Sequence, residues 1–317
     1  MLYFLNNIRL SDEKYTQTLR NDMPATQKIM RGEPDMARKL FCEISPLAYR
    51  ISVEKEIILR NIRNAFSVVR FSGQKNEELL PVAVIKHRSL IRRKLHNVDQ
   101  NLQENKAKTL SIASPLVSHI MIYPGETFSF WKLIGRPSYK KGYLDGVTIT
   151  KGRAHPGVGG GICQLSNLIH WMILHTDLDI TEHWHHDSMD LFPDFKRQIP
   201  FGTGTSVSFN NLDYRFKNNT NRIYQLIIYT TQEYLCGEIR ATESLPIKIH
   251  IREEESYFYE KDGEMYRHNK IYRRVVDKIT GNTMEDKLLM EHNAQVMYDW
   301  NLIDSDRIIT SRAIACT

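Results

Sequence analysis

The sequence has few cysteines, no long apolar run and no internal repeat, and each absence excludes a class of protein. Its four cysteines are scattered without a CxxC pair, which argues against a disulfide framework and a four-cysteine zinc site. No window approaches the ~18 apolar residues of a membrane-spanning helix. The opening "MLYFLNNIRLSDEKYTQ" starts like a secretory signal, but charged residues interrupt it and no small-residue cleavage pattern follows. We therefore expect a cytoplasmic protein with no transmembrane segment, no structural zinc and no other cofactor.

The composition provides enough apolar material for a core, together with a modest positive charge. Hydrophobic residues make up 41% of the chain and charged residues 25%, as in ordinary soluble proteins. The formal net charge of +6 suits an anionic partner without selecting one. The basic cluster at residues 86–94 lacks interleaved stacking aromatics, so a solvated helix face is favoured over nucleic-acid binding. We expect no nucleic-acid partner.

The apolar pattern predicts an α+β fold with a helical front and a strand-rich back half. Up to about residue 104, apolar and charged residues alternate at helical spacing, with Pro46 as a break. Residues 165–173 carry one apolar stripe and predict a helix, and a strand is expected from about Ile180. The segments "GTGTSVSFNNLDYRFKNNT" and "YQLIIYTTQEYLCGEIRA" predict a β-hairpin. Turn signals at residues 262–263 and 281–282 separate further antiparallel strands.

A glycine run precedes one cysteine at the start of the apolar helix, in "GVGGGICQLSNLIHW". The loop glycines are Gly159, Gly160 and Gly161, and glycine lets a substrate approach the backbone closely. Unpaired N–H groups and the helix dipole at a helix N-terminus lower the pKa of a thiol, here that of Cys163. The N–H groups of this loop, including that of Gln164, are suited to bind an oxyanion. Cys163 is therefore a candidate nucleophile.

A simpler interpretation of the same stretch is a glycine-capped helix that carries a buried cysteine. The helical wheel favours the nucleophile, because Cys163 lies opposite the apolar stripe and shares its face with Asn167 and His170. A phosphate-binding loop is not supported, since the Gly-Lys-Ser/Thr ending of a P-loop and the GxGxxG spacing are both missing.

Histidines cluster in "EHWHHDSMD", about twenty residues after the cysteine. A cysteine nucleophile needs a base. On a strand, His183 and His185 point to one side and His186 to the other, so only one side of the run can face Cys163. Three roles stay open for these histidines: a base for the thiol, zinc ligands completed by a thiolate, or solvated side chains on an edge strand.

Several motifs, in their order and spacing, resemble the VanW family, which is named for an accessory protein of B-type vancomycin resistance operons. They are "PGETFSFWKLIG", "GGGICQLSNLIHW", "EHWHH", "GTGTSV" and "LDYRFKNNT". The resemblance divides the chain into a mainly helical region at 1–104, a VanW domain at 105–245 and an antiparallel β extension at 246–317. It implies a cysteine-bearing helix packed on an antiparallel sheet.

The resemblance also implies cell-wall chemistry, because some secreted members look like cysteine-dependent L,D-transpeptidases that cross-link peptidoglycan stem peptides. On that pattern Cys163 matches the family's cysteine, and His186 matches the histidine that closes its E-x-x-x-H stretch. The chain departs from the pattern at two positions. Most relatives have arginine in place of His183, and many have aspartate in place of Gly204.

The implied reaction is attack of the Cys163 thiolate on the amide carbonyl that joins a diamino acid to D-alanine. His186 would protonate the leaving amine, and the thioester would pass to an acceptor amine or to water. The expected partner is therefore a peptidoglycan stem peptide or its precursor. Arg136 and Arg153 flank the predicted site and are suited to hold a terminal carboxylate. Glu126 is a further candidate for this site.

Glu126, Asp187 and Asp213 are the candidates for a third catalytic member. Two rival functions stay open beside acyl transfer. One is a non-catalytic accessory protein that binds wall precursors or glycopeptides, and the other is a zinc protein that uses the histidine cluster.

Overall fold

The computed structural model describes residues 41–92, 100–150, 153–185, 189–191, 193–194, 198–209 and 211–309. The chain forms two compact units, Met1–Ile51 and Ser52–Thr317. Helix α2 (Phe41–Ile44) and the first residues of helix α3 (Pro46–Phe66) belong to the first unit. Pro46 begins α3, a position where its missing N–H costs nothing. The domain boundaries predicted at residues 105 and 245 stay predictions.

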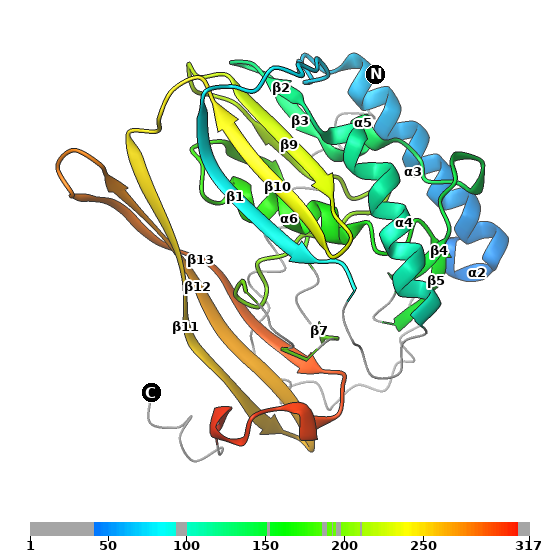
Figure 1. Cartoon of the computed structure of the whole chain (residues 1–317). Coiled ribbons are helices and arrows are strands. Elements are labelled where there is room, and N and C mark those ends of the chain that lie inside the picture. The colour runs from blue at the N-terminus through cyan, green and yellow to red at the C-terminus, as the bar shows by residue number, and fades with distance from the viewer. Residues whose placement is uncertain are drawn as a thin grey trace, which may run out of the picture. The chain divides into compact units, whose positions relative to one another are not determined.

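A four-stranded antiparallel sheet lies at the centre of the second unit (Figure 1). Its strand order is β1 (Val82–Leu90), β10 (Tyr234–Ala241), β9 (Tyr224–Thr230) and β2 (Ile120–Ile122). Strands β9 and β10 form a hairpin, but it lies wholly within residues 224–241. The predicted pairing of this segment with residues 202–220 is therefore wrong.

Strand β1 occupies part of the basic cluster for which a helix face was predicted, so that prediction is also wrong. Lys86 and Arg88 are exposed while His87 and Ser89 are partly buried, which is the two-residue period of a strand. Antiparallel pairing with β10 along the whole of β1 supplies backbone hydrogen bonds that a local helical pattern does not reveal. Residues 93–94 of the cluster lie outside the described residues.

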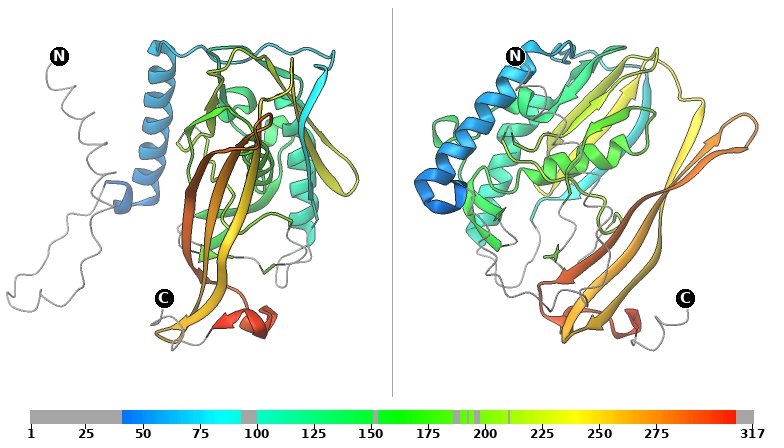
Figure 2. Two further views of the ribbon diagram at one scale, coloured as in Figure 1. Left: turned by 90° about the vertical axis from the view of Figure 1, so that its left-hand side faces the viewer. Right: turned by 180° about the vertical axis from the view of Figure 1, so that it is seen from behind.

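Helix α6 (Cys163–Ile173) packs on the four-stranded sheet against β1 and β10. It lies on the face turned away from the viewer in Figure 1 and toward the viewer in the right-hand view of Figure 2. Leu165, Ile169 and Met172 of its predicted apolar stripe are completely buried. Helix α4 (Gln100–Val117) packs against β9 and contacts α6. The predicted α+β class, with a cysteine-bearing helix on an antiparallel sheet, is confirmed.

Smaller sheets complete the described part of the second unit. One sheet has the order β3 (Thr127–Ser129), β8 (Arg215–Lys217), β6 (Asp179–Glu182), and a separate hairpin joins β4 (Asp145–Thr150) to β5 (Arg153–Val158). The short helix α5 (Phe130–Ile134) follows β3 directly. No helix among the described residues is long and apolar enough to span a membrane.

The C-terminal part contains the predicted long antiparallel strands, β11 (Ile247–Lys261), β12 (Glu264–Asp277) and β13 (Thr283–Val296), and a two-residue strand pairs in parallel at each edge of their sheet. The order of this sheet is β14 (Ile308–Ile309), β11, β12, β13, β7 (Met189–Asp190). The turn between β11 and β12 has positive φ at both Asp262 and Gly263, the geometry that an Asp-Gly pair favours. Short strand β7 pairs with β13, so this sheet reaches the segment that follows the histidine run.

Candidate functional site

One pocket, with a volume of about 770 Å³, brings together several of the residues predicted from the sequence. Cys163, Gln164 and Arg136 line it, together with the loop at residues 157–161 and a wall at residues 198–209. Three histidines also line it, His87, His155 and His185. A cavity of this size accommodates a small peptide or a drug-sized ligand.

The glycine loop is held against strand β4 by its own backbone. Gly159 and Gly161 have φ of +75° and +85°, a region that side chains disfavour. The N–H groups of all four predicted oxyanion residues donate to carbonyls: Gly159 to Leu144, Gly160 to Gly157, Gly161 to Val147, and Gln164 to Gly161, at 2.9 to 3.1 Å. The predicted oxyanion role is thus not supported for these groups, because each is already engaged.

Gly160 lies where the loop meets β4, and we predict that Gly160→Ala destabilises the protein. A Cβ on Gly160 would lie 2.1 Å from the carbonyl carbon of Gly146, and backbone cannot yield there without moving the strand. We expect a loss of about 1–3 kcal/mol in urea unfolding. Gly73→Ala is the matched control, since its Cβ would meet nothing within 4 Å. Equal stability of the two variants would contradict the close-contact explanation.

Cys163 is the first residue of α6 and keeps some exposed surface. Burial nevertheless raises the pKa of its thiol, and backbone N–H groups of Val207 and of Cys163 itself oppose this increase only in part. The sequence predicted a lowered pKa, so the predicted direction is wrong. The physical reason is desolvation by the pocket wall, which disfavours the thiolate more than the helix terminus favours it.

We predict that Cys163 in the resting protein titrates above the ordinary thiol value of ~8.5. Alkylating reagents react with the thiolate, so the rate at Cys163 should have its midpoint above that pH. Peptide mass spectrometry after iodoacetamide treatment across a pH series measures it site by site, and Cys163→Ala identifies the signal. A midpoint below ~7.5 would instead restore the thiolate predicted from the sequence.

The histidine run begins just after β6 ends at Glu182. The rings of His170 on α6 and His183 stack at 4.4 Å, and His185 follows His183 at 6.2 Å. His183 and His185 thus share one side, as predicted, although residues 183–185 are not the strand from which this was inferred. His183 Nε2 donates to the carbonyl of Gly204 at 3.0 Å, which fixes the proton on that nitrogen. His186 lies outside the described residues, so its pairing with Cys163 stays a prediction.

His170 is completely enclosed between these histidines and Tyr214. Its Nδ1 lies 3.1 Å from the Tyr214 hydroxyl, and burial, with His183 and His185 nearby, holds its pKa well below the ordinary value. The ring is therefore neutral at physiological pH. Among the described residues, no group of three or more His, Cys, Asp or Glu side chains is arranged to hold a metal ion.

The predicted substrate-binding residues lie in different places. Arg136 lines the pocket but already pairs with both carboxylate oxygens of Glu54, at 2.6 and 3.2 Å. Glu126 is buried, receives the Tyr123 N–H and pairs with Arg70, and it is not among the described residues that line the pocket. Arg153 is part of β5, but its side chain lies outside the description. Of the three predicted substrate-binding residues, only Arg136 therefore has a described side chain that lines the pocket.

Sequence comparison agrees with the motifs that surround this pocket. A family model described as VanW like protein matches residues 105–240. The vancomycin B-type resistance protein VanW of Enterococcus faecalis is 31% identical over 205 residues, covering 64% of this chain and 74% of that protein. The chain belongs to the VanW family. The name of this relative links the family to vancomycin resistance.

A second relative matches a shorter part of the chain. The uncharacterized protein YoaR of Bacillus subtilis is 30% identical over 122 residues, which are 38% of this chain and 37% of that protein. No solved structure matches the chain.

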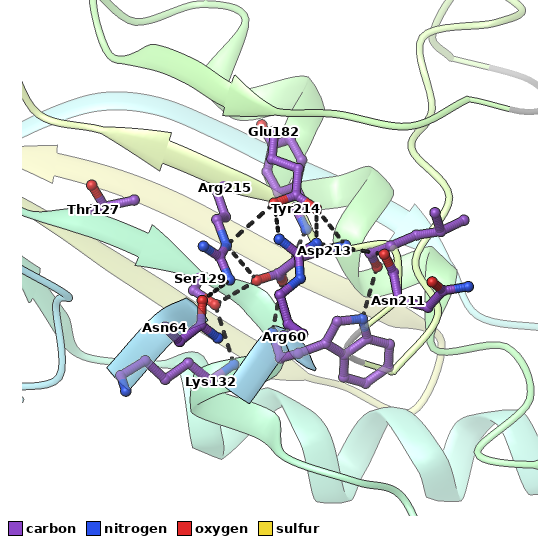
Figure 3. Close-up of polar contacts among 12 residues, drawn as sticks. Arg60, Asn64, Thr127, Ser129, Lys132, Glu182, Asn211, Asp213, Tyr214 and Arg215 are labelled. Carbon is purple, nitrogen blue, oxygen red and sulfur yellow. Dashed lines mark hydrogen bonds and ion pairs between the residues drawn. The ribbon is translucent and has the colours of Figure 1, made fainter. Parts of the chain in front are cut away.

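Three VanW motifs meet in one polar network beside the histidine run (Figure 3). Glu182 accepts hydrogen bonds from both Nη atoms of Arg60, from Trp184 Nε1 at 3.0 Å and from the Asp213 N–H at 3.0 Å. Asp213 in turn accepts from Ser129 Oγ at 2.6 Å and Arg215 Nε at 2.7 Å. The network ties the end of β6 in place just before the histidines.

This network contains Asp213, one of the candidates for a third catalytic member. Asp213 is 2% exposed, both its oxygens accept hydrogen bonds, and it is not among the described residues that line the pocket. Its catalytic role stays a prediction. Asp187 lies outside the described residues. Burial opposes ionisation of Glu182, but hydrogen bonds from Arg60 and Trp184 outweigh it and lower the pKa of that carboxyl below its usual value.

Residues 203–207 form part of the pocket wall, whereas the sequence pattern predicted a strand there. Asn167 Oδ1 accepts the Thr205 N–H at 2.7 Å, and the Ser206 N–H donates to the Trp184 carbonyl at 2.7 Å. Asn167 had one usable signal, its position one turn after Cys163 on the polar face of the helix. His155, on β5, carried no sequence signal for a place at the pocket except its position shortly before the glycine loop.

Proposed function

We propose that the protein catalyses acyl transfer on peptidoglycan stem peptides, with Cys163 as nucleophile. The observation that carries this proposal is that Cys163 and His185 line one pocket large enough for a short peptide. The family assignment supports it, because the related vancomycin-resistance protein is named for an antibiotic directed at the cell wall. The cytoplasmic location expected from the sequence stays part of the proposal, and the substrate there would be a soluble precursor or a recycled wall peptide.

In the proposed reaction the Cys163 sulfur attacks the amide carbonyl between the diamino acid and D-alanine. The S–C bond forms, the C–N bond breaks and free D-alanine leaves with the proton taken from the thiol. An acceptor amine then displaces the thiol to form a new amide, or water does so in a carboxypeptidase reaction. The Val207 N–H, which lies at the sulfur, is the donor best placed to stabilise the developing oxyanion.

A base is needed because burial keeps the resting thiol protonated. We assign this role to the His185–His186 pair, of which His185 lines the pocket with Cys163 and His186 matches the family's histidine. Proton transfer to an imidazole as the substrate binds would generate the thiolate only when it is needed.

The raised thiol pKa also favours a second function for the same pocket. A buried, protonated cysteine is unreactive, and a non-catalytic protein that binds wall precursors or glycopeptides requires only the pocket. The two functions differ in one measurable respect, namely whether a covalent bond to Cys163 forms.

The deciding experiment is intact-protein mass spectrometry after incubation with a stem tetrapeptide that ends in D-alanine. Acyl transfer predicts an adduct with the mass of the peptide less that of the released alanine. Binding detected by calorimetry without any adduct or product would reject catalysis and support the non-catalytic function.

A further inference from the structure

The long strands of the C-terminal sheet, β11 to β13, lie outside the region that the family model matches, yet their side chains contact the wall of the pocket. The family match ends at residue 240, and strands β11 to β13 span residues 247–296. Three of their buried side chains reach the segment between the histidine run and the pocket wall: Arg267, Asn269 and His292.

Arg267 forms ion pairs with two acidic residues of this segment. It is 1% exposed, and its guanidinium donates to Asp190 at 3.3 Å and to Asp194 at 2.8 Å. The same group lies over the ring of Phe201, 4.4 Å from its centroid. Asp190 and Phe201 both line the pocket, so a buried charge of the C-terminal sheet anchors two points of its wall.

Asn269 makes a second, independent attachment. It is completely buried, and its Nδ2 donates to the carbonyl of Phe201 at 3.0 Å. A buried backbone carbonyl without such a partner is costly. This hydrogen bond therefore keeps Phe201 against β12.

His292 packs directly on His185, one of the histidines that line the pocket. It is 2% exposed, and its ring lies 4.8 Å from that of His185, inclined by 66°. Gly202, with φ +83°, fits under this ring: a Cβ there would come within 2.0 Å of His292 Nε2. Neither ring nitrogen of His292 has a hydrogen-bond partner among the described residues, so its contact with the site is made by ring packing.

We propose that the C-terminal sheet is a positioning element of the Cys163 pocket, in which His292 holds His185 and the turn at Gly202 in their working places. From β12 and β13, Arg267, Asn269 and His292 contact His185, Asp190, Asp194, Phe201 and Gly202. None of these three side chains belongs to the region that the family model matches. Loss of the His292 ring opens a cavity behind His185 and Gly202. The wall then relaxes into the cavity, and water reaches the Cys163 sulfur.

The test compares the rate and the pH midpoint of Cys163 alkylation in full-length variants that remain folded by circular dichroism. His292→Ala is expected to increase the rate at neutral pH at least about threefold and to move the midpoint toward the ordinary thiol value of ~8.5. His292→Phe keeps a ring of similar shape and is expected to stay within about twofold of the unsubstituted protein. Lys287→Ala, on the exposed part of β13, is the control and should change nothing.

Asn269→Leu provides a second probe if His292→Ala does not fold, because it removes the bond to Phe201 with little change of volume. Alkylation at the original rate in either folded variant would overturn the proposal. So would a His292→Phe variant as reactive as His292→Ala, because the role would then belong to the ring nitrogens. Alkylation requires no catalysis, so absence of a peptide adduct would reject the proposed function and leave this inference standing.

Discussion

Cys163→Ala is expected to abolish the covalent adduct with a stem tetrapeptide and to lower any transfer or hydrolysis activity by at least about 10³-fold. Removing a catalytic nucleophile leaves only binding and electrostatic contributions to the rate. The hydroxyls that line the pocket, such as Thr203 and Ser206, are poor replacements, because a hydroxyl is far less acidic than a thiol. Mass spectrometry of the intact protein and product analysis on the same samples measure both effects.

Two matched variants make this experiment specific. Cys163→Ser keeps nearly the same shape and should also lose activity, which separates thiol chemistry from packing. Cys236→Ala, on β10, should retain full activity, since Cys236 is not among the residues that line the pocket. An adduct that persists in Cys163→Ala, or disappears in Cys236→Ala, would remove Cys163 from the mechanism.

Glu182→Gln is expected to destabilise the protein by about 3 kcal/mol at pH 7, because it removes one partner from a largely buried ion pair. The side chains of Arg60 and Glu182 are only 19% and 14% exposed. The folded-state pKa of Glu182 is lowered, so its contribution to stability is present above its unfolded pKa of about 4.3 and is lost as the pH falls through the folded value. Urea unfolding at pH 7 and at pH 3.5 measures this, and the difference from the unsubstituted protein should shrink at the lower pH.

Glu104→Gln is the control for this prediction. Glu104 forms a similar two-pronged pair with Arg92 at 2.6 and 2.7 Å, but both side chains are well exposed, and exposed pairs contribute little. We expect no measurable change in its unfolding midpoint. Equal losses in the two variants, or a loss in Glu182→Gln that does not depend on pH, would contradict a buried, ionised network.

The features that local sequence determines were predicted correctly. The apolar stripe of α6 repeats at helical spacing, and Leu165 and Ile169 are buried as that repeat requires. The turn at Asp262 and Gly263 needs positive φ at both residues, and few other residue pairs provide it. The motifs that carry the family resemblance are likewise contiguous in the chain. Each of these depends on neighbours within a few residues.

Predictions failed where the deciding partner lies far away in the chain. Residues 82–90 form a strand because they pair with β10, about 150 residues later. Two of the loop N–H groups, those of Gly159 and Gly161, donate to the carbonyls of Leu144 and Val147. No local sequence pattern predicts that this segment lies beside the loop.

At the site, local sequence and tertiary contacts have opposite effects on the thiol pKa of Cys163. Sequence alone placed Cys163 at the start of a helix after a glycine loop, where the helix terminus by itself would lower the thiol pKa. Only the tertiary structure brings Val207 and the rest of the wall over the sulfur, and the resulting desolvation raises the pKa instead. The place of His292 beside His185, from a strand more than 100 residues further on, was likewise beyond any local pattern. Burial and electrostatics sum over every neighbour in space, whereas periodicity and turn chemistry report only neighbours in sequence.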